Sequence, residues 1–315
     1  MEQQIAHVAN QIQLPNGLPI QFSSNATLRR ATADEIDEID RRLALANAAT
    51  SIPLRSFRHH YEHKQVGTSS SYVPTPLPDK DWRYHVLDFE GDGLIFLRLQ
   101  QILVLTEPPV YLAFRTITGL TNTIKGISPM QMHILERAER LWWNNPNGLL
   151  INVEQVLPSY QAWSKLLESQ VEFLFVAEAV EKYFDLQRLP PCSDMYLLGL
   201  FSIIESLVAH KPRLTENLDS IIHQLVNKLA LLDECFIINS VRAENFFNGI
   251  DNKKAWKKLY QFRSQLAHTS SSPLSAELVT LISKEIILSF VDSKTKELIR
   301  FAISQPKILH HLKEC

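Results

Sequence analysis

The sequence is poor in cysteine and contains no long apolar run. Its 315 residues include three cysteines, Cys192, Cys235 and Cys315, which are odd in number and lack the spacing of metal ligands. This pattern favours free thiols in a reducing compartment over a disulfide framework. No uncharged apolar run approaches the roughly 18 residues of a membrane helix, and the first residues lack the positive flank of a secretory signal. We therefore expect a cytoplasmic protein that does not span a membrane.

The sequence also lacks a strong net charge and a glycine-rich phosphate loop. The formal net charge is −2, so a nucleic-acid site would have to be a local basic patch. Gly91-Asp92-Gly93 reads as a turn, and the absence of a phosphate-cradling loop argues against a classical nucleotide-hydrolysing motor. His59 and His63 lie near Glu62, but the further ligands of a zinc site are missing. We expect that segment to be solvated, and we expect neither a metal nor a cofactor.

The composition is that of an ordinary globular protein, with 45% hydrophobic and 21% charged residues, and the length suggests about two domains. The first half reads as α+β. Thr32 and Glu35 form a capping box that predicts a helix over residues 33–46, and Ser128-Pro129 predicts the start of a helix that ends near Trp143. Alternating or β-type apolar runs predict strands at residues 18–22, 82–87, 94–105 and 110–114.

The second half reads as all helical, with short connections that are typical of an antiparallel bundle. We place the domain boundary near residue 150, which gives an α+β domain over residues 1–150 and a helical domain over residues 151–315. The first domain is expected to be a sensor or regulatory domain. Helical periodicity predicts helices within residues 160–185, 194–209, 216–236, 253–268, 275–289 and 293–303.

Residues 253–268 combine the side chains that metal-free cleavage of RNA requires. Arg263 supplies a planar, permanent cation suited to phosphate oxygens, and His268 supplies a proton-transfer group near neutral pH. Ser264 follows the arginine, and Glu205 stands on an apolar helix upstream. A basic run precedes the pair and could hold the RNA backbone through Lys253, Lys254, Lys257 and Lys258.

These pieces, in this order, resemble the HEPN superfamily and, within it, the Apea-like HEPN domains. The resemblance covers roughly residues 155–305. It rests on residues 198–207 with Glu205, on a long helix around residues 218–235, and on residues 259–268, which look like the family's Arg-x4-6-His motif. The first half looks compatible with the α+β region that often precedes such domains in bacterial defence proteins. In active relatives the residue after the arginine is usually Asn, Asp or His, whereas here it is Ser264.

The resemblance implies a helical bundle that dimerises and acts as a metal-independent endoribonuclease, in anti-phage defence or as a toxin. The two motifs would form one composite cleft across the dimer axis. A 2′-hydroxyl would attack the adjacent phosphate and leave a 2′,3′-cyclic phosphate, with His268 as general base or acid and Arg263 stabilising the developing charge. RNA, possibly tRNA, would be the substrate, and a phage-derived trigger or regulatory protein would be a further partner. Positions five apart on a helix point about 140° apart, so a single chain brings both side chains to one phosphate only at a helix start or bulge.

Other interpretations of the same residues remain open. Arg263 could form a surface salt bridge, His268 could cap a loop, and the lysines could form a solvated helix face. Glu205 could pair with Arg263, orient His268, or face solvent beside Ser202 and Ser206. At the level of function, the alternatives are a non-catalytic HEPN-type module that binds RNA or protein, and an antitoxin-like or nucleotidyl-transfer partner subunit.

Overall fold

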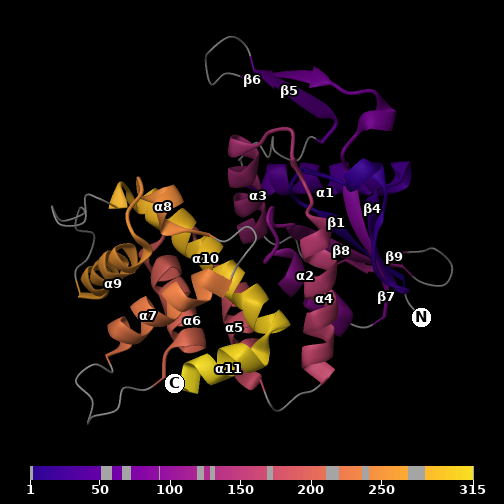
Figure 1. The fold of residues 1–315 in the computed structure, drawn as a ribbon. Helices are drawn as coiled ribbons and strands as arrows, with labels where there is room; N and C mark the ends of the chain where they lie inside the picture. The colour runs from indigo at the N-terminus through magenta and orange to yellow at the C-terminus, as the bar shows by residue number, and fades with distance from the viewer. Residues whose placement is uncertain are drawn as a thin grey trace. The chain divides into compact units, whose positions relative to one another are not determined.

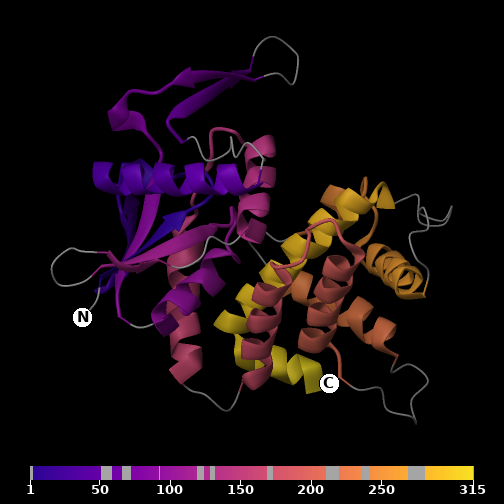
Figure 2. The same cartoon turned by 180° about the vertical axis from the view of Figure 1, so that it is seen from behind.

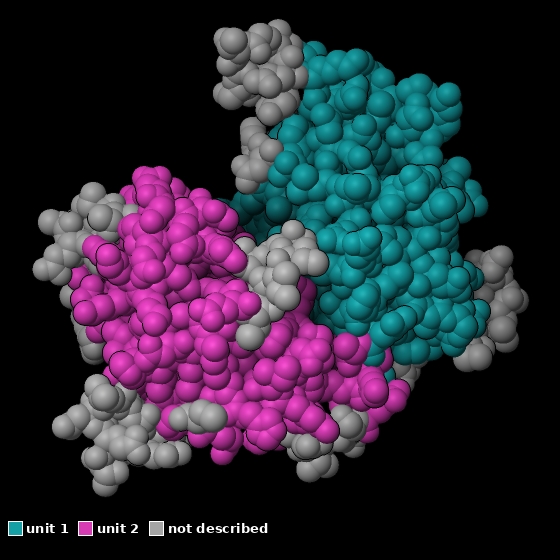
Figure 3. Space-filling model, viewed as in Figure 1, with its two compact units in different colours: residues 1–161 teal, residues 162–315 magenta. Residues whose placement is uncertain are grey.

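The computed structural model describes most of the chain, namely residues 3–50, 59–65, 72–91, 93–118, 124–127, 132–168, 173–210, 220–235, 241–268 and 281–314. The chain divides into two compact units, residues 1–161 and residues 162–315 (Figure 3). Helix α4 (Val153–Glu168) spans this division, which lies beyond the boundary that the sequence suggested near residue 150. The predicted fold class is confirmed, because an α+β unit precedes an all-helical one.

A six-stranded antiparallel sheet forms the centre of unit 1, in the order β3-β4-β7-β1-β8-β9. Its strands are β1 (Gln3–Val8), β3 (Ile20–Ser23), β4 (Ala26–Arg30), β7 (His85–Glu90), β8 (Leu112–Thr118) and β9 (Ile124–Ile127). Leu87 pairs with Ala6 on one side and with Leu28 on the other, so these three buried side chains share one face.

Helices cover both faces of this sheet. On one face, Arg29 of β4 forms an ion pair with Glu35 in the first turn of α1 (Ala33–Thr50), which lies across the strands in Figure 2. On the other face, Phe89 of β7 stacks on Phe96 of α2 (Gly93–Leu103) with 5.5 Å between ring centroids. The predicted capping box of α1 is confirmed, since the Thr32 backbone N–H donates to Glu35 at 2.7 Å.

Shorter elements complete unit 1 around the sheet (Figure 1). Strand β2 pairs in parallel with β10, and β5 pairs with β6 as an antiparallel hairpin. Their bounds, with those of the short helices, are β2 (Ile12–Gln13), η1 (Pro15–Gly17), β5 (Tyr61–Gln65), β6 (Tyr72–Pro76), η3 (Asp79–Asp81), α3 (Met132–Asn144) and β10 (Leu149–Leu150).

Two predictions for unit 1 are wrong. The run at residues 94–105, expected to be a strand, forms helix α2, because Leu, Arg and Gln are strong helix formers and the run is longer than most strands. The segment with His59 and His63, expected to be solvated, is buried in part: the two residues are 3% and 9% exposed. The His59 ring lies 5.2 Å from the Tyr84 ring, so tertiary packing covers a stretch whose local sequence is polar.

Helix α6 is the central helix of unit 2 and contacts α5, α7, α9, α10 and α11. It is buried over most of its surface, and Ser193 caps its start by accepting a hydrogen bond from the Tyr196 backbone N–H at 3.1 Å. The helices are α5 (Leu174–Leu186), α6 (Asp194–Val208), α7 (Ile221–Cys235), α8 (Ala243–Phe246), α9 (Asn252–His268), α10 (Lys284–Ser304) and α11 (Pro306–Glu314). Among the described segments, none of these or the earlier helices has the length and hydropathy needed to cross a membrane.

The last helix that the sequence predicted differs from expectation. Residues 293–303 do not form a helix of their own, since α10 runs without a break from Lys284 to Ser304. The polar Asp292 at the predicted break instead accepts hydrogen bonds from the hydroxyls of Tyr183 and Tyr196, at 3.0 and 2.6 Å. Residues 275–280 of the other predicted helix lie outside the described residues.

Candidate functional site

Helix α9 carries most of the candidate residues, and its sequence explains its orientation. The Asp251 side chain accepts a hydrogen bond from the Lys254 backbone N–H at 3.2 Å, the contact expected of a residue that caps a helix start. One face of the helix is buried in the core of unit 2 through Ala255, Trp256, Leu259 and Phe262. This helical spacing holds α9 against its neighbours α6 and α7.

Arg263 and Glu205 meet where α9 packs on α6. Arg263 Nε lies 3.3 Å from Glu205 Oε1, and Arg263 Nη2 donates a long hydrogen bond of 3.5 Å to Glu205 Oε2. The Nε contact is an ion pair without hydrogen-bond alignment. The side chains are 31% and 19% exposed, so the guanidinium lies at the surface while the carboxylate is largely covered. Of the alternatives that the sequence left open for Glu205, the structure shows the pairing with Arg263.

Burial makes the charged form of Glu205 costly. Loss of solvent raises the pKa of the Glu205 carboxyl above its ordinary value, and the positive charge of Arg263 opposes this rise only in part. Tyr260, one turn before Arg263, has its ring 5.5 Å from the guanidinium carbon. Burial, followed by the nearby Glu205 charge, raises the pKa of the Tyr260 hydroxyl. The arginine therefore lies between a carboxylate and an aromatic ring.

Tyr260 was not among the predicted site residues. Its signal in the sequence is the i to i+3 spacing from Arg263, which places two side chains side by side on a helix. The contact with Glu205 had no such local signal, because it joins residues 58 positions apart.

His268 is the last residue of α9, and only its backbone lies within the described part of the chain. The helix is continuous from Arg263 to His268, without the start or bulge that would bring positions five apart onto one face. The two positions are therefore rotated by about 140° around the helix axis. The course of the backbone in a single chain therefore does not place the Arg263 and His268 positions on the same side of the helix, where one phosphate could contact both.

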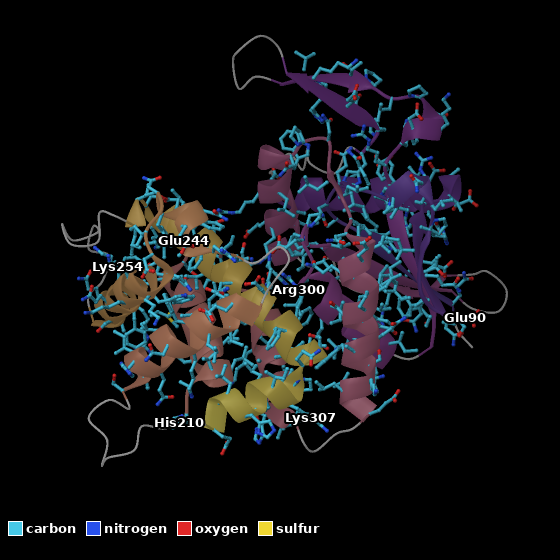
Figure 4. All side chains as sticks on the ribbon, in the orientation of Figure 1. Glu90, His210, Glu244, Lys254, Arg300 and Lys307 are labelled. Atoms are coloured by element: carbon cyan, nitrogen blue, oxygen red, sulfur yellow. The ribbon has the colours of Figure 1, made fainter. Side chains whose placement is uncertain are left out.

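The predicted lysines lie along the solvent side of α9. Lys253, Lys254 and Lys257 are exposed, and Lys258 and Ser264 are partly covered. Figure 4 shows Lys254 at the periphery of the helical unit. The aromatic residue within this run, Trp256, is 2% exposed and packs against Phe290, with 5.5 Å between ring centroids. The run therefore offers a basic face without an exposed ring for base stacking.

Among the described residues, no three His, Cys, Asp or Glu side chains are close enough together to hold a metal ion. His63, part of the segment considered for zinc, has its pKa lowered by burial, and its ring packs edge-on against Trp142 at 5.0 Å. The residues gathered at α6 and α9 thus offer a cation, a carboxylate, a phenol and flanking lysines.

Comparison with known proteins adds no family to this description. No family model, no curated protein and no solved structure matches the chain.

Proposed function

We propose that the protein is a metal-independent endoribonuclease whose site is built from Arg263 and His268 of two copies of the chain. Glu205 positions the arginine, and the exposed lysines of α9 bind the RNA backbone. The proposal includes an action in anti-phage defence or as a toxin, since such an enzyme would halt growth when unrestrained.

The Glu205–Arg263 pair is the observation that carries this proposal. An arginine fixed by a carboxylate has lost much of its rotamer freedom before a ligand arrives, so binding a phosphate costs less entropy. Glu205 faces Nε and Nη2, which leaves Nη1 directed away from the carboxylate. Nη1 can therefore bind a second anion while Nε and Nη2 stay beside Glu205.

The continuous helix favours a composite site. Because the positions of Arg263 and His268 are rotated by about 140° around the axis of α9, we place the two residues at one phosphate by combining Arg263 of one chain with His268 of a second. A two-fold axis repeats this arrangement, so each dimer contains two such pairs.

The chemistry uses groups that this chain supplies. One histidine takes the proton of the 2′-hydroxyl, and the resulting oxyanion attacks the adjacent phosphorus. The bond to the 5′-oxygen breaks, and the leaving oxygen receives the proton that the same histidine took up. Arg263 stabilises the charge that develops on the non-bridging oxygens. The products are a 2′,3′-cyclic phosphate and a 5′-hydroxyl, and DNA resists cleavage because it lacks the nucleophile.

The test is cleavage of mixed cellular RNA by the purified full-length protein in EDTA. Arg263→Ala and His268→Ala are each expected to lower the rate at least about 100-fold, the usual effect of losing a proton-transfer group or an oxyanion-stabilising one. Arg188→Ala and His223→Ala are matched controls, because both residues are exposed in unit 2 outside α9, Arg188 in the turn after α5 and His223 on α7. Their activity should equal that of the wild type.

Two results would overturn the proposal. One is intact RNA after incubation with the wild-type dimer, and the other is an Arg263 or His268 variant that cleaves like the wild type. Mass spectrometry of the product ends gives an independent check, since a 3′-phosphate formed without a cyclic intermediate is incompatible with 2′-hydroxyl attack.

A non-catalytic RNA-binding module is the second candidate. It is favoured by the same 140° rotation, because Arg263 and the lysines bind phosphates without any need for His268. Under this alternative, Arg263→Ala weakens RNA binding in a gel-shift assay, His268→Ala does not, and neither protein cleaves RNA.

A further inference from the structure

Unit 1 contains a cavity of about 350 Å³ at one end of the central sheet, remote in sequence from the α6–α9 residues. This volume falls within the range of small-molecule sites in proteins. The lining comes from β2, η1, the end of β4, the η3 region and the start of β7, and consists of Ile12, Gln13, Leu14, Gly17, Arg30, Leu77, Asp81, Arg83 and His85. Two arginines and a histidine therefore surround one space.

The sheet register brings two of these residues together. Arg30, the last residue of β4, lies directly opposite His85, the first residue of β7. Paired residues in an antiparallel sheet project on the same face. Strands β4 and β7 are neighbours in the sheet (Figure 1), so the positions of Arg30 and His85 are fixed by backbone hydrogen bonds.

Arg30 differs from the arginine next to it in the sequence. Arg29 points to the other face, where Glu35 and Asp88 neutralise it at 2.8 and 2.9 Å. Arg30 donates from Nη2 to the Trp82 carbonyl oxygen at 2.6 Å, and within the described residues it forms no ion pair. One strand therefore carries a neutralised arginine on one face and an arginine with an uncompensated charge on the other.

Arg83 approaches the cavity from a second segment. Its Nη1 donates to the Asn147 carbonyl oxygen at 2.7 Å, and Gln13 Nε2 donates to the same oxygen at 3.2 Å. This contact anchors the guanidinium without neutralising it, because a carbonyl carries no net charge. The described residues offer Arg83 no carboxylate as an ion-pair partner, and Asp81 is the one carboxylate in the cavity lining.

His85 supplies a buried polar atom without a partner. The residue is 5% exposed, and its Nδ1 is buried without a hydrogen-bond partner among the described residues. Burial, with the charges of Arg30 and Arg83 adding to it, lowers the pKa of the ring to about 4. Nδ1 of the neutral ring can accept a hydrogen bond, and leaving such a buried atom unpaired costs free energy.

We propose that this cavity binds a small phosphomonoester, with Arg30 and Arg83 on the phosphate oxygens and His85 Nδ1 accepting a hydrogen bond from a phosphate or sugar hydroxyl. Two guanidinium groups that approach from different segments match a tetrahedral anion. The single carboxylate, Asp81, leaves the lining with an excess of positive charge. The site lies wholly within unit 1, and its proposed role does not depend on the nuclease proposal.

Isothermal titration of the full-length protein tests this proposal. The probes are inorganic phosphate, ribose 5-phosphate, adenosine 5′-monophosphate and, as the neutral counterpart, adenosine. The three phosphates should bind and adenosine should not. The two phosphomonoesters distinguish a sugar phosphate from a nucleotide as the ligand, because a base that adds contacts makes the nucleotide bind more tightly.

Arg30→Gln and Arg83→Gln should each weaken phosphate binding about 10- to 100-fold, the effect of losing one hydrogen bond to a charged group. Arg41→Gln on α1 is the matched control, because Arg41 is 56% exposed and pairs with Glu38 away from the cavity lining. Circular dichroism without ligand verifies folding. If Arg83→Gln does not fold, the Arg30→Gln variant still tests the proposal. Arg30 lies at the surface, so its replacement should not prevent folding.

The proposal is overturned if none of the three phosphates binds to the wild type. It is also overturned if Arg30→Gln binds them as tightly as the wild type does, or if adenosine binds as tightly as its monophosphate.

Discussion

Glu205 is a carboxylate on the most apolar helix of unit 2, and its environment sets its energetics. Buried residues precede and follow it on α6, among them Ile204 and Leu207. A carboxylate in such a place is costly unless it is paired. The half-exposed Arg263 supplies that pair, at the loose distances of 3.3 and 3.5 Å. We infer that Glu205 is retained for its effect on Arg263 and that it lowers the stability of the fold at neutral pH.

The pH dependence of stability tests this inference at the level of the residue. Because burial raises the pKa of Glu205 in the folded state, that state binds the proton more tightly than the unfolded chain does. The free energy of unfolding should therefore fall as the pH rises from 4.5, the ordinary value of the group, through the folded pKa. Glu205→Gln removes this dependence. In urea unfolding, the variant should gain stability relative to the wild type between about pH 4.5 and about pH 7.

Glu178→Gln is the control, because Glu178 is 54% exposed and forms a surface pair with Lys182 on α5. Its stability relative to the wild type should change little over the same range. A Glu205→Gln variant that loses relative stability as the pH rises would show that the ion pair with Arg263 outweighs burial.

The helices of unit 2 are joined by a buried lysine. Lys294 of α10 is 0% exposed and contacts Asp233 of α7, Glu297 of its own helix at 2.7 Å, and the Val241 carbonyl oxygen at 3.1 Å. Asn252, the first residue of α9, donates to the same Asp233. A network of this kind fixes where α9 begins, and thereby where Arg263 lies relative to α6.

Lys294→Met tests the network at the level of the elements. The change leaves two carboxylates without their cation, and breaking a buried pair in this way costs about 3–5 kcal/mol. The urea midpoint of the helical unit should fall, and amide hydrogen exchange in α7 and α9 should accelerate. Lys182→Met, at an exposed pair on α5, is the control and should stay within about 0.5 kcal/mol of the wild type. Equal exchange rates in the wild type and Lys294→Met would refute the role of this lysine.

At the scale of the whole molecule, the decisive issue is whether one chain or two supply the nuclease site. If Arg263 of one chain works with His268 of another, a dimer of Arg263→Ala with His268→Ala keeps one intact pair. Random mixing makes about half of the dimers mixed. Each mixed dimer contains one intact Arg263–His268 pair where a wild-type dimer contains two, so about one quarter of the wild-type activity should return.

The measurement is RNA cleavage after the two inactive variants have been co-refolded, with each variant alone as the control. Arg188→Ala mixed with His223→Ala should show full activity, which verifies that mixing does no damage. A mixture of the inactive pair that stays inactive, although native mass spectrometry shows mixed dimers, would place both residues of a site in one chain.

The local sequence was a good guide where structure follows from local rules. The predicted helix at residues 194–209 matches α6 within a residue, because Ser193 caps it and its apolar spacing is helical throughout. The capping box at Thr32 was equally informative. Prediction failed where an apolar run was compatible with both a helix and a strand, as in α2. It also failed where a segment pairs or packs with residues far away in the sequence.

Strand β1 shows why segments with distant partners are not predicted from the local sequence. Its residues Gln3–Val8 include two glutamines and a histidine and carry no clear strand signal, yet the strand pairs with β7 and β8 near the middle of the sheet. His7 is 2% exposed there and stacks on Phe114, with 4.2 Å between ring centroids. Burial of polar residues at such a position depends on strands formed about 80 or more residues later, as its pairing with Val86 shows.

The sequence by itself determined the α+β and all-helical halves, most helices of the second half, and the residue types of the candidate site. Helix periods, caps and turn residues act over a few positions, so they can be read without a fold. Only the tertiary structure decided that Glu205 reaches Arg263 and that Arg30, Arg83 and His85 line one cavity. These contacts join distant segments, and their geometry is set by how helices pack and how strands pair.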